Sequence, residues 1–316
     1  MRVYAAIALA ALTAAAPQAA RACVDFQATG SDLNVRYDPF NPAPIERVFT
    51  LRVQRLDPSV SAVRFIVVDG DAVGGVARIG QGPDGYDIRS VRDGSRPLFF
   101  RGAEQPNASN GLLTSFGQGP GGDIATETLR LSIPAGRDTP AGDYFEPLEV
   151  RFTCQGSDGV PGAADFQLDA RFAIDLRVPE ILSTYVGAPG VRRGQIAFGP
   201  LNPDGGVLNR DLVVTAQSTV PYGIEIDRRR GRLQRRDDDA YGLDYDLRLS
   251  GAPVTSGVAA ACARTPAPAG RAHTLQVALS QGQAARVPAG AYGDVVTLNF
   301  TPRLGLSGQD GCVSGL

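Results

Sequence analysis

The chain has 316 residues, of which 43% are hydrophobic, and it contains 38 Gly and 23 Pro. A net charge of −2 leaves no basic surplus to neutralise phosphates, which argues against nucleic acid as a partner. All 31 basic residues are arginine, so chemistry that needs a lysine, such as a Schiff base or a Walker-A loop, is excluded. The composition favours a protein with apolar cores and many turns.

The first 22 residues have the pattern of a secretory signal peptide. Arg2 supplies the positive start, Ala5–Ala16 form a short apolar run, and Ala20-Arg21-Ala22 gives the small-x-small cleavage pattern. The run is too short to cross a bilayer. A lipoprotein anchored at Cys23 is the alternative, but Ala-Arg-Ala is a poor lipobox. We therefore expect an exported chain in which Cys23 forms a disulfide.

Four cysteines follow the expected cleavage site: Cys23, Cys154, Cys262 and Cys312. An even number in an exported protein predicts two disulfides. Two cysteines fall in each half, so Cys23–Cys154 and Cys262–Cys312 are the simplest pairs, although the spacing leaves the other two connectivities open. None of the spacings resembles a C-x-x-C metal or redox motif.

The strongest signal is an internal duplication. Three segments recur in the same order, and their paired ranges are 34–42 with 195–203, 86–89 with 245–248, and 140–144 with 288–292. In the first pair, alternating apolar residues lead into an aromatic residue and a Pro-apolar-Asn-Pro turn. The offset between the copies then falls from 159 to 148 residues, so the first copy carries about 11 extra residues within 90–139.

Short alternating apolar runs, separated by Gly, Pro, Asn and Asp, recur along both copies and predict β-strands. We expect an all-β protein of two tandem immunoglobulin-like β-sandwiches. The predicted boundaries are 1–22 for the signal peptide, 23–179 for the N-terminal domain and 180–316 for the C-terminal domain.

The two copies differ after their last matched strand. The first continues into a long alternating segment, which predicts a strand across its own core. Its apolar positions include Phe166, Leu168, Phe172, Ile174 and Leu176. The second copy has no such segment after Thr301, so we expect it to lack its final strand and to expose a groove and a sheet edge. Such an edge binds a strand from another chain, and the mature N-terminus offers no free strand in return.

Several segments resemble the spore coat protein U domain of archaic chaperone–usher (Csu-type) pili. They are 196–200, 221–226, 243–247 and, most specifically, 288–298. The resemblance covers the second copy well and the first more loosely, which has Tyr37-Asp38 in place of Phe-Gly. It implies an immunoglobulin-like fold lacking its last strand, a periplasmic chaperone and an outer-membrane usher. Within such systems a two-domain subunit is similar to a tip adhesin.

Three other features of the sequence are interpreted as structural and not as functional sites. His273, the single histidine, is better explained as structural than as catalytic, since neither a His-rich zinc site nor a Ser-His-Asp triad is supported. Gly117–Gly122 is expected to be a loop, because no Lys-Ser/Thr follows to complete a phosphate site. The charged run from Arg228 to Asp239 is expected to be a solvated hairpin tip. We predict no metal, no cofactor and no enzyme activity.

Large apolar residues in the longer loops of the first copy are the candidate surface-binding residues. They are Leu98, Phe99, Phe100, Leu112, Leu113 and Phe116. Exposed together, they would form a patch that binds apolar surfaces. For Leu98 to Phe100 a core strand is an equal alternative, whereas an exposed loop is favoured for the other three.

The leading hypothesis is therefore a pilus-tip adhesin that acts in surface attachment and biofilm formation. Its expected partners are a periplasmic chaperone, an outer-membrane usher, a neighbouring pilin that donates a strand, and an abiotic or host surface. Its expected location is the pilus tip at the cell surface, or the secreted fraction. A structural pilin or coat protein without a specific ligand is the alternative, and a secreted carbohydrate-binding module or enzyme is a third.

Overall fold

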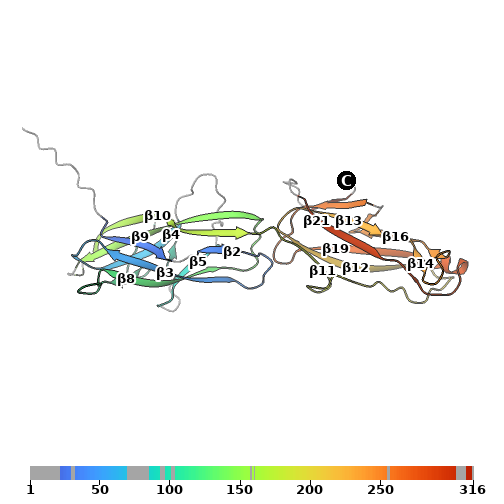
Figure 1. Cartoon of the computed structure of the whole chain (residues 1–316), viewed down its shortest axis with the longest axis horizontal. Coiled ribbons are helices and arrows are strands. Elements are labelled where there is room, and N and C mark those ends of the chain that lie inside the picture. The colour runs from blue at the N-terminus through green and yellow to red at the C-terminus, as the bar shows by residue number, and fades with distance from the viewer. Residues whose placement is uncertain are drawn as a thin grey trace, which may run out of the picture.

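The computed structural model describes residues 22–29, 33–69, 85–92, 97–100, 104–156, 159, 161–254, 257–303 and 311–314. Apart from Ala22, the predicted signal peptide lies outside these residues. Two bodies of β-structure lie end to end along the long axis of the molecule, as Figure 1 shows. Among the described residues, no helix is long and apolar enough to cross a membrane.

The N-terminal half is a sandwich of two sheets. The first has the order β1 (Val24–Thr29), β3 (Ile45–Arg55), β8 (Ile124–Ile133), β5 (Asp87–Ser90). The second has the order β2 (Asn34–Arg36), β10 (Pro161–Val178), β9 (Gly142–Gly156), β4 (Val60–Asp69), β6 (Phe99–Phe100), and β7 (Leu112–Ser115) also pairs with β4. Because side chains alternate between the faces of a strand, one face of each sheet supplies the core.

Aromatic rings fill the centre of this first core. Phe26 of β1 packs against Phe65 of β4 and Phe152 of β9, with ring centroids 5.2 Å apart in both pairs. Phe65 and Phe152 are fully buried. A tilted or edge-on arrangement of aromatic rings adds to the stabilisation that their burial provides. The same face of β8 contributes Leu129, Leu131 and Ile133, all with no exposed surface.

The C-terminal half is a second sandwich with a small added sheet. One large sheet has the order β11 (Leu182–Val186), β12 (Val207–Ser218), β19 (Arg271–Ser280), β16 (Tyr245–Leu249), β17 (Ala252–Pro253). The facing sheet has the order β21 (Val296–Pro302), β13 (Tyr222–Arg228), β18 (Gly257–Cys262), β22 (Cys312–Ser314). The small sheet consists of β15 (Gly242–Leu243), β14 (Leu233–Arg235) and β20 (Tyr292–Gly293), and η1 (Gln281–Arg286) is a short 3₁₀-helix.

Direct contacts join the two halves. The hydroxyl of Thr219 accepts a hydrogen bond from Ile181 N (2.8 Å) and donates one to Pro179 O (2.9 Å), so it binds the backbone that connects β10 to β11. Ala141 N donates to Thr219 O, and the Arg264 guanidinium pairs with Asp138 across the junction. The connection is therefore an ordered joint with its own hydrogen bonds.

The predicted fold class is confirmed, because the described residues form β-sandwiches of the immunoglobulin-like kind. Both disulfides are present, and each lies within one half: Cys23 is bonded to Cys154, and Cys262 to Cys312. The charged run from Arg228 to Asp239 includes β14 and its turns, which lie at the outer end of the C-terminal half (Figure 1). Most of its aspartates are exposed, as expected of a solvated tip.

Candidate functional site

The strand β10 completes the N-terminal sandwich. It runs antiparallel to β9 along most of its length and parallel to β2, with Leu176 opposite Val35. Ile174, Leu176 and Val178 point into the core and are at most 2% exposed. β10 therefore lies between β9 and β2, and its last part fills the space between them.

One detail of this strand differs from the sequence expectation. A register shift against β9 lies between Leu168 and Ala173. The alternation is therefore interrupted, and the prediction of one unbroken apolar face is wrong. The backbone of Phe166 pairs with Arg151 and that of Leu168 with Glu149. The side chains of Phe166, Leu168 and Phe172 lie outside the described residues.

The corresponding place in the C-terminal half is open. β21, which matches β9 in sequence, pairs with β13 on one side. Among the described residues, no strand pairs with its other edge. Residues 195–197, which match β2, belong to no strand. Since β9 and β2 enclose β10 in the first half, β21 and residues 195–197 border the same position without a strand between them.

A groove of about 680 Å³ lies at this position, between β11 and β21. Its lining residues are Leu182, Thr184, Arg192, Glu225, Leu298, Asn299, Phe300, Thr301 and Pro302. The strands on its two sides, Leu182–Val186 and Val296–Pro302, carry no charged residue. Natural sheet edges are usually blunted by charges, bulges or a covering segment, so the uncharged edge of β21 is suited to strand addition.

Residues at matched core positions are more exposed beside the groove than in the N-terminal half. In β9, Leu148, Val150 and Phe152 are between 0% and 2% exposed. Their counterparts in β21, at an offset of 148, are Val296, Leu298 and Phe300, and all three are only partly buried.

The first strands of the repeat show the same difference. Val35 is 3% and Tyr37 1% exposed, whereas the matching Ile196 and Phe198 are partly exposed. The core of the second half is therefore uncovered along one side.

Phe300 links the groove to a buried polar pair. Its ring centroid lies 6.1 Å from that of Tyr222 and 6.0 Å from that of His273. Tyr222 Oη and His273 Nε2 are hydrogen-bonded at 2.8 Å across the two sheets. Both side chains are at most 2% exposed.

Burial shifts the titration of both members of this pair. Desolvation, with a smaller contribution from the charge of Arg271, lowers the pKa of His273 to about 4. Desolvation also raises the pKa of Tyr222 to about 12. Both groups are therefore neutral near pH 7, and the imidazole serves as a packed, hydrogen-bonded core group.

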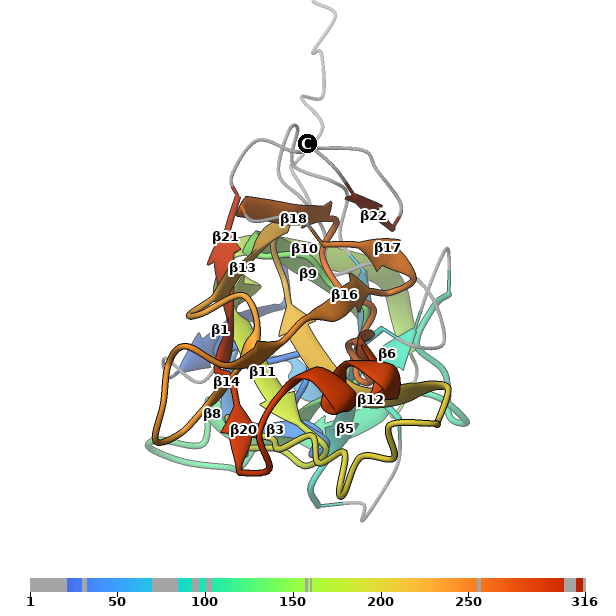
Figure 2. The same ribbon diagram turned by 90° about the vertical axis from the view of Figure 1, so that its right-hand side faces the viewer.

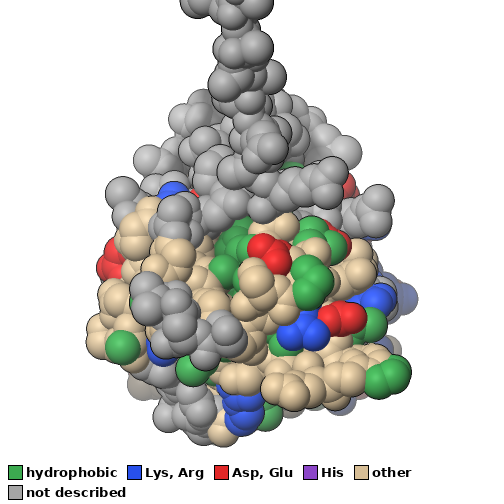
Figure 3. Space-filling view, turned by 90° about the vertical axis from the view of Figure 1, so that its left-hand side faces the viewer, with side chains coloured by type: hydrophobic (Ala, Val, Ile, Leu, Met, Phe, Trp, Pro, Cys, Tyr) green, Lys and Arg blue, Asp and Glu red, His purple; other side chains and the backbone are tan. Residues whose placement is uncertain are grey.

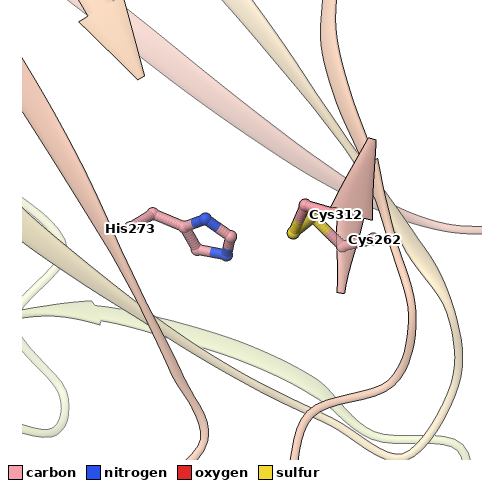
Figure 4. Close-up of side chains that lie close together, drawn as sticks. All are labelled: Cys262, His273 and Cys312. Carbon is pink, nitrogen blue, oxygen red and sulfur yellow. A yellow bond between two sulfur atoms is a disulfide. The ribbon is translucent and has the colours of Figure 1, made fainter. Parts of the chain in front are cut away.

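His273 also lies beside the second disulfide, as Figure 4 shows. The ligand atoms of Cys262, His273 and Cys312 all lie within 4.8 Å of one another, a spacing that a metal ion could bridge. The thiolate form of cysteine is the metal ligand, and both sulfurs are bonded to each other here. In its disulfide-bonded form the cluster is therefore structural: it ties β22 to β18 next to a buried histidine.

The segment after β21 takes a different route from the one after β9. β22 pairs antiparallel with β18, with Cys312 opposite Cys262 and Val313 opposite Ala261. In Figure 2, β21 and β22 lie on opposite sides of this sheet, with β13 and β18 between them. β22 therefore covers the edge that is farthest from the groove and leaves the edge of β21 open.

The predicted surface-binding residues are only partly where the sequence suggested. Leu98 is fully buried and Leu112 is 1% exposed, so the prediction of an exposed loop is wrong for Leu112, and for Leu98 the alternative of a core position holds. Leu112 begins β7, where it lies opposite Phe65 in β4, so the apolar residue belongs to an inward-facing strand position. Phe99 packs against the core, and its ring centroid lies 4.5 Å from that of Tyr86. The side chain of Phe100 lies outside the described residues.

Leu113 and Phe116 remain at the surface to different extents. Leu113 is 36% exposed. Phe116 is partly buried beneath Arg55, whose guanidinium carbon lies 5.5 Å from the ring centroid. Arg55 is held in place by Asp123, at 2.5 Å, and by the carbonyl of Val60, at 3.1 Å. The loop from Phe116 to Asp123 is therefore fixed to the end of the sandwich.

Two exposed apolar residues at that end were missed by the sequence reasoning. Leu56, which follows β3, is 52% exposed, and Ile124, the first residue of β8, is 44% exposed. Figure 3 views this outer end of the N-terminal half, where hydrophobic side chains lie beside acidic and basic ones. Both residues sit where a strand meets a turn. Inspection of strand ends, instead of long loops, would have found them.

Comparisons with known proteins give only distant structural likenesses. No family model matches the chain, and no curated protein matches it either. Among solved structures, the chain is similar to the CsuC–CsuE chaperone–tip adhesion subunit complex of Acinetobacter baumannii Csu pili. In that comparison the identity is 13%, the TM-score is 0.36, and 79% of this chain and 89% of that chain are covered.

A second similar structure is that of a mutant form of the CFA/I adhesin CfaE of enterotoxigenic E. coli. The identity is 14%, the TM-score is 0.32, and 90% of this chain and 82% of that chain are covered. At this level of identity the likeness concerns the all-β architecture alone.

Proposed function

We propose that the chain is a two-domain subunit of a surface fibre, whose C-terminal half joins it to a neighbour by accepting a β-strand in the β11–β21 groove. The observation that carries the proposal is the pair of matched strands: β9 pairs with β10 and its Leu148, Val150 and Phe152 are buried, whereas Val296, Leu298 and Phe300 of β21 are only partly buried and the outer edge of β21 has no partner strand among the described residues. A strand with alternating apolar side chains would bury all three and pair with the free edge of β21.

In this proposal the domains divide as the sequence analysis suggests, at 23–179 and 180–316. The N-terminal domain completes itself with β10 and is free to bind a surface. The motifs that resemble the spore coat protein U domain support a pilin-like role for the C-terminal domain. A periplasmic chaperone would hold the open groove during export, an outer-membrane usher would assemble the subunit, and a pilin would finally fill the groove.

The proposed surface-binding region is the outer end of the N-terminal half. Leu56, Leu113 and Ile124 are exposed there or close by, and Phe116 lies under Arg55. Each apolar side chain that leaves water on contact would contribute up to roughly 1.5–3 kcal/mol. In a fibre, this end would be directed away from the strand-accepting groove, consistent with a tip adhesin that acts in attachment and biofilm formation.

The chain itself supplies a probe for the groove. A synthetic peptide of residues 161–178 has the sequence that fills the equivalent place in the N-terminal half. We expect it to bind the full chain and to raise its thermal stability. A peptide in which Ile174 and Leu176 are replaced by aspartate is the matched control and should not bind.

A pair of protein variants locates the binding. Leu298→Asp places a carboxylate inside the groove and should weaken peptide binding at least tenfold, because an unpaired charge is costly to bury. Thr297→Asp introduces the same charge at an exposed neighbouring position of β21 and should bind nearly as well as the unmodified chain. Equal binding by the two variants, or no binding by the unmodified chain, would contradict the proposed groove.

A structural subunit without a specific ligand is the second candidate, and the exposed end separates the two. Replacing Leu56 and Ile124 by serine should reduce attachment of assembled fibres to apolar surfaces if this end binds them. Unchanged attachment by normally assembled fibres would favour the structural role.

A further inference from the structure

The edge of β18 is the second sheet edge in the C-terminal half that needs an explanation. β18 has the sequence Gly-Val-Ala-Ala-Ala-Cys, with no charged residue and no proline. Charges, prolines and bulges are the features that usually keep an edge from pairing with another chain. The register shift against β13 lies between Ile224 and Glu225, where β18 carries the extra residue Ala259, so the regular part of the β18 edge is Ala260–Cys262.

β22 covers this edge. Three residues, Cys312–Ser314, pair with Ala260–Cys262, and Ala263 N donates a further hydrogen bond to Gly311 O at 2.9 Å. Such a short strand gains little by itself, because each residue that is ordered loses conformational entropy worth about 1–2 kcal/mol. The disulfide from Cys312 to Cys262 therefore makes the pairing persistent, since it keeps the strand next to β18 even when its hydrogen bonds break.

The residues around the Cys262–Cys312 disulfide help to hold β22 next to β18. Cys262 is 1% exposed and belongs to the second core, while Cys312 lies at the surface. Arg271 Nη1 lies 3.2 Å from Cys312 Sγ, and the same side chain contacts the carbonyl of Arg264. β22 is thus attached to the sandwich through a buried anchor and a surface contact.

We propose that the Cys262–Cys312 disulfide acts as an edge cap. It keeps β22 on β18 and so prevents the β18 edge from pairing with the β18 edge of a second copy of this chain. A two-fold symmetric contact, in which the same surface of both copies meets, is the commonest arrangement of identical subunits, and antiparallel pairing of two β18 edges would be such a contact. With the cap in place, the sheet ends in the three-residue strand β22 on one side and in the seven-residue strand β21 on the other, so strand addition is favoured at the groove edge.

The test compares the two disulfides of the same chain. The variant Cys262→Ser with Cys312→Ser frees β22, whereas Cys23→Ser with Cys154→Ser removes the other disulfide, which links β1 to β9 within the first sandwich. Each is studied by analytical ultracentrifugation and by amide hydrogen exchange, with and without the 161–178 peptide. We expect the first variant to form dimers with at least tenfold higher affinity than the unmodified chain, and the second to behave as the unmodified chain does.

Amide hydrogen exchange shows whether the β18 edge forms the dimer contact. In the Cys262/Cys312 variant, the β18 amides that do not bond to β13 should exchange fast in dilute monomer and slowly in the dimer. A variant that stays monomeric at all concentrations, or a dimer in which β18 amides are not protected, would overturn the edge cap. If that variant does not fold, Val313→Pro takes its place, because it keeps the disulfide and removes a backbone donor of β22. Unchanged self-association of a folded Val313→Pro chain would then overturn the proposal.

The outcome is separable from that of the proposed function. Failure of the peptide to bind would contradict the groove and leave the comparison of the two disulfide variants intact. Dimerisation of the Cys262/Cys312 variant that the peptide abolishes would place the contact at the groove and would also overturn the edge cap.

Discussion

The two halves of the molecule have matching strands but treat the segment after the last matched strand in opposite ways. In the N-terminal half this segment turns back as β10 and pairs with β9, in which Leu148, Val150 and Phe152 are buried. In the C-terminal half it crosses to the far edge of the sheet as β22, and Val296, Leu298 and Phe300 stay partly exposed. The edge on which this following strand lies thus distinguishes a self-sufficient sandwich from one that can accept a strand.

Two buried ionisable groups at matched positions extend this comparison. Glu127 of β8 and His273 of β19 occupy corresponding inward positions, judged by the pairing of β5 with β8 and of β16 with β19. Glu127 accepts a hydrogen bond from Thr114 at 2.6 Å and pairs with Arg92 at 3.1 Å. His273 instead bonds to Tyr222 and packs near Phe300, which borders the groove. The first group is held by an ion pair and the second by an aromatic cluster.

The largest expected effect is a difference between two phenylalanines at matched positions. Phe152→Ala should lower the free energy of unfolding of the N-terminal half by about 3–5 kcal/mol, because a fully buried ring leaves a cavity. Phe300→Ala should cost the C-terminal half clearly less in the unmodified chain, since its ring is partly solvated. Chemical denaturation followed by a probe in each half measures both values.

Filling the groove should make Phe152→Ala and Phe300→Ala more alike in their cost to stability. With the 161–178 peptide bound, the cost of Phe300→Ala should rise towards that of Phe152→Ala. Equal costs without peptide would show that Phe300 is already covered and would remove the basis of the comparison.

The next effect is a pH dependence confined to the C-terminal half. The pKa of His273 is lowered to about 4 from 6.5, so the unfolded chain binds a proton more readily than the folded chain. Stability is therefore full above pH 6.5 and falls as the pH drops towards 4, by about 3 kcal/mol in total. The groups that face the imidazole are Tyr222, Arg271 and the nearby disulfide.

His273→Gln is the variant that isolates this contribution. Glutamine keeps a polar partner for Tyr222 and does not titrate, so the difference in stability between the two chains should narrow as the pH falls from 6.5 to 4. A difference that stays constant across this range would contradict a buried neutral histidine.

A smaller effect is expected at the junction of the halves. Thr219→Ala removes the hydroxyl that binds Ile181 N and Pro179 O, and it leaves a backbone donor without that partner, at a cost of about 1–2 kcal/mol. The angle between the halves should also become more variable. Small-angle scattering would detect a broader distance distribution, and an unchanged distribution would show that Thr219 does not hold the joint.

The smallest effect concerns the ion pair across the same junction. Arg264→Ala should cost less than about 1 kcal/mol, because the Arg264–Asp138 pair is partly exposed to solvent. The loss should shrink further at high salt. Denaturation at low and high ionic strength measures it, and a loss above about 2 kcal/mol would mean that the pair supports the joint more than its exposure suggests.

Sequence reasoning reached the fold and the position of the open groove because both depend on local patterns. Alternation and turn residues define strands, and the repeat aligned Phe152 with Phe300 and Val35 with Ile196. The pairing of Cys262 with Cys312 was the simplest of three possible connectivities, because each half holds two cysteines. These features are set by residues that are near one another in sequence or that recur at a fixed offset.

The candidate surface-binding residues could not be predicted in the same way. Leu98 and Leu112 lie in a segment rich in turn residues, but backbone pairing with β4 buries them in the core. The register shift in β10 and the route of β22 to the β18 edge depend on long-range pairing, which alternation does not encode. Sequence alone therefore located the open groove but not the strand that caps the opposite edge.

The central claim is that β21 has a free edge that accepts a strand, whereas β9 does not. Amide hydrogen exchange of the full chain, with and without the 161–178 peptide, tests it directly. We predict that β21 amides that do not bond to β13 exchange fast and become protected when the peptide is added, while β9 amides are slow in both states. Protection of β21 without the peptide, or no change when it is added, would contradict the account.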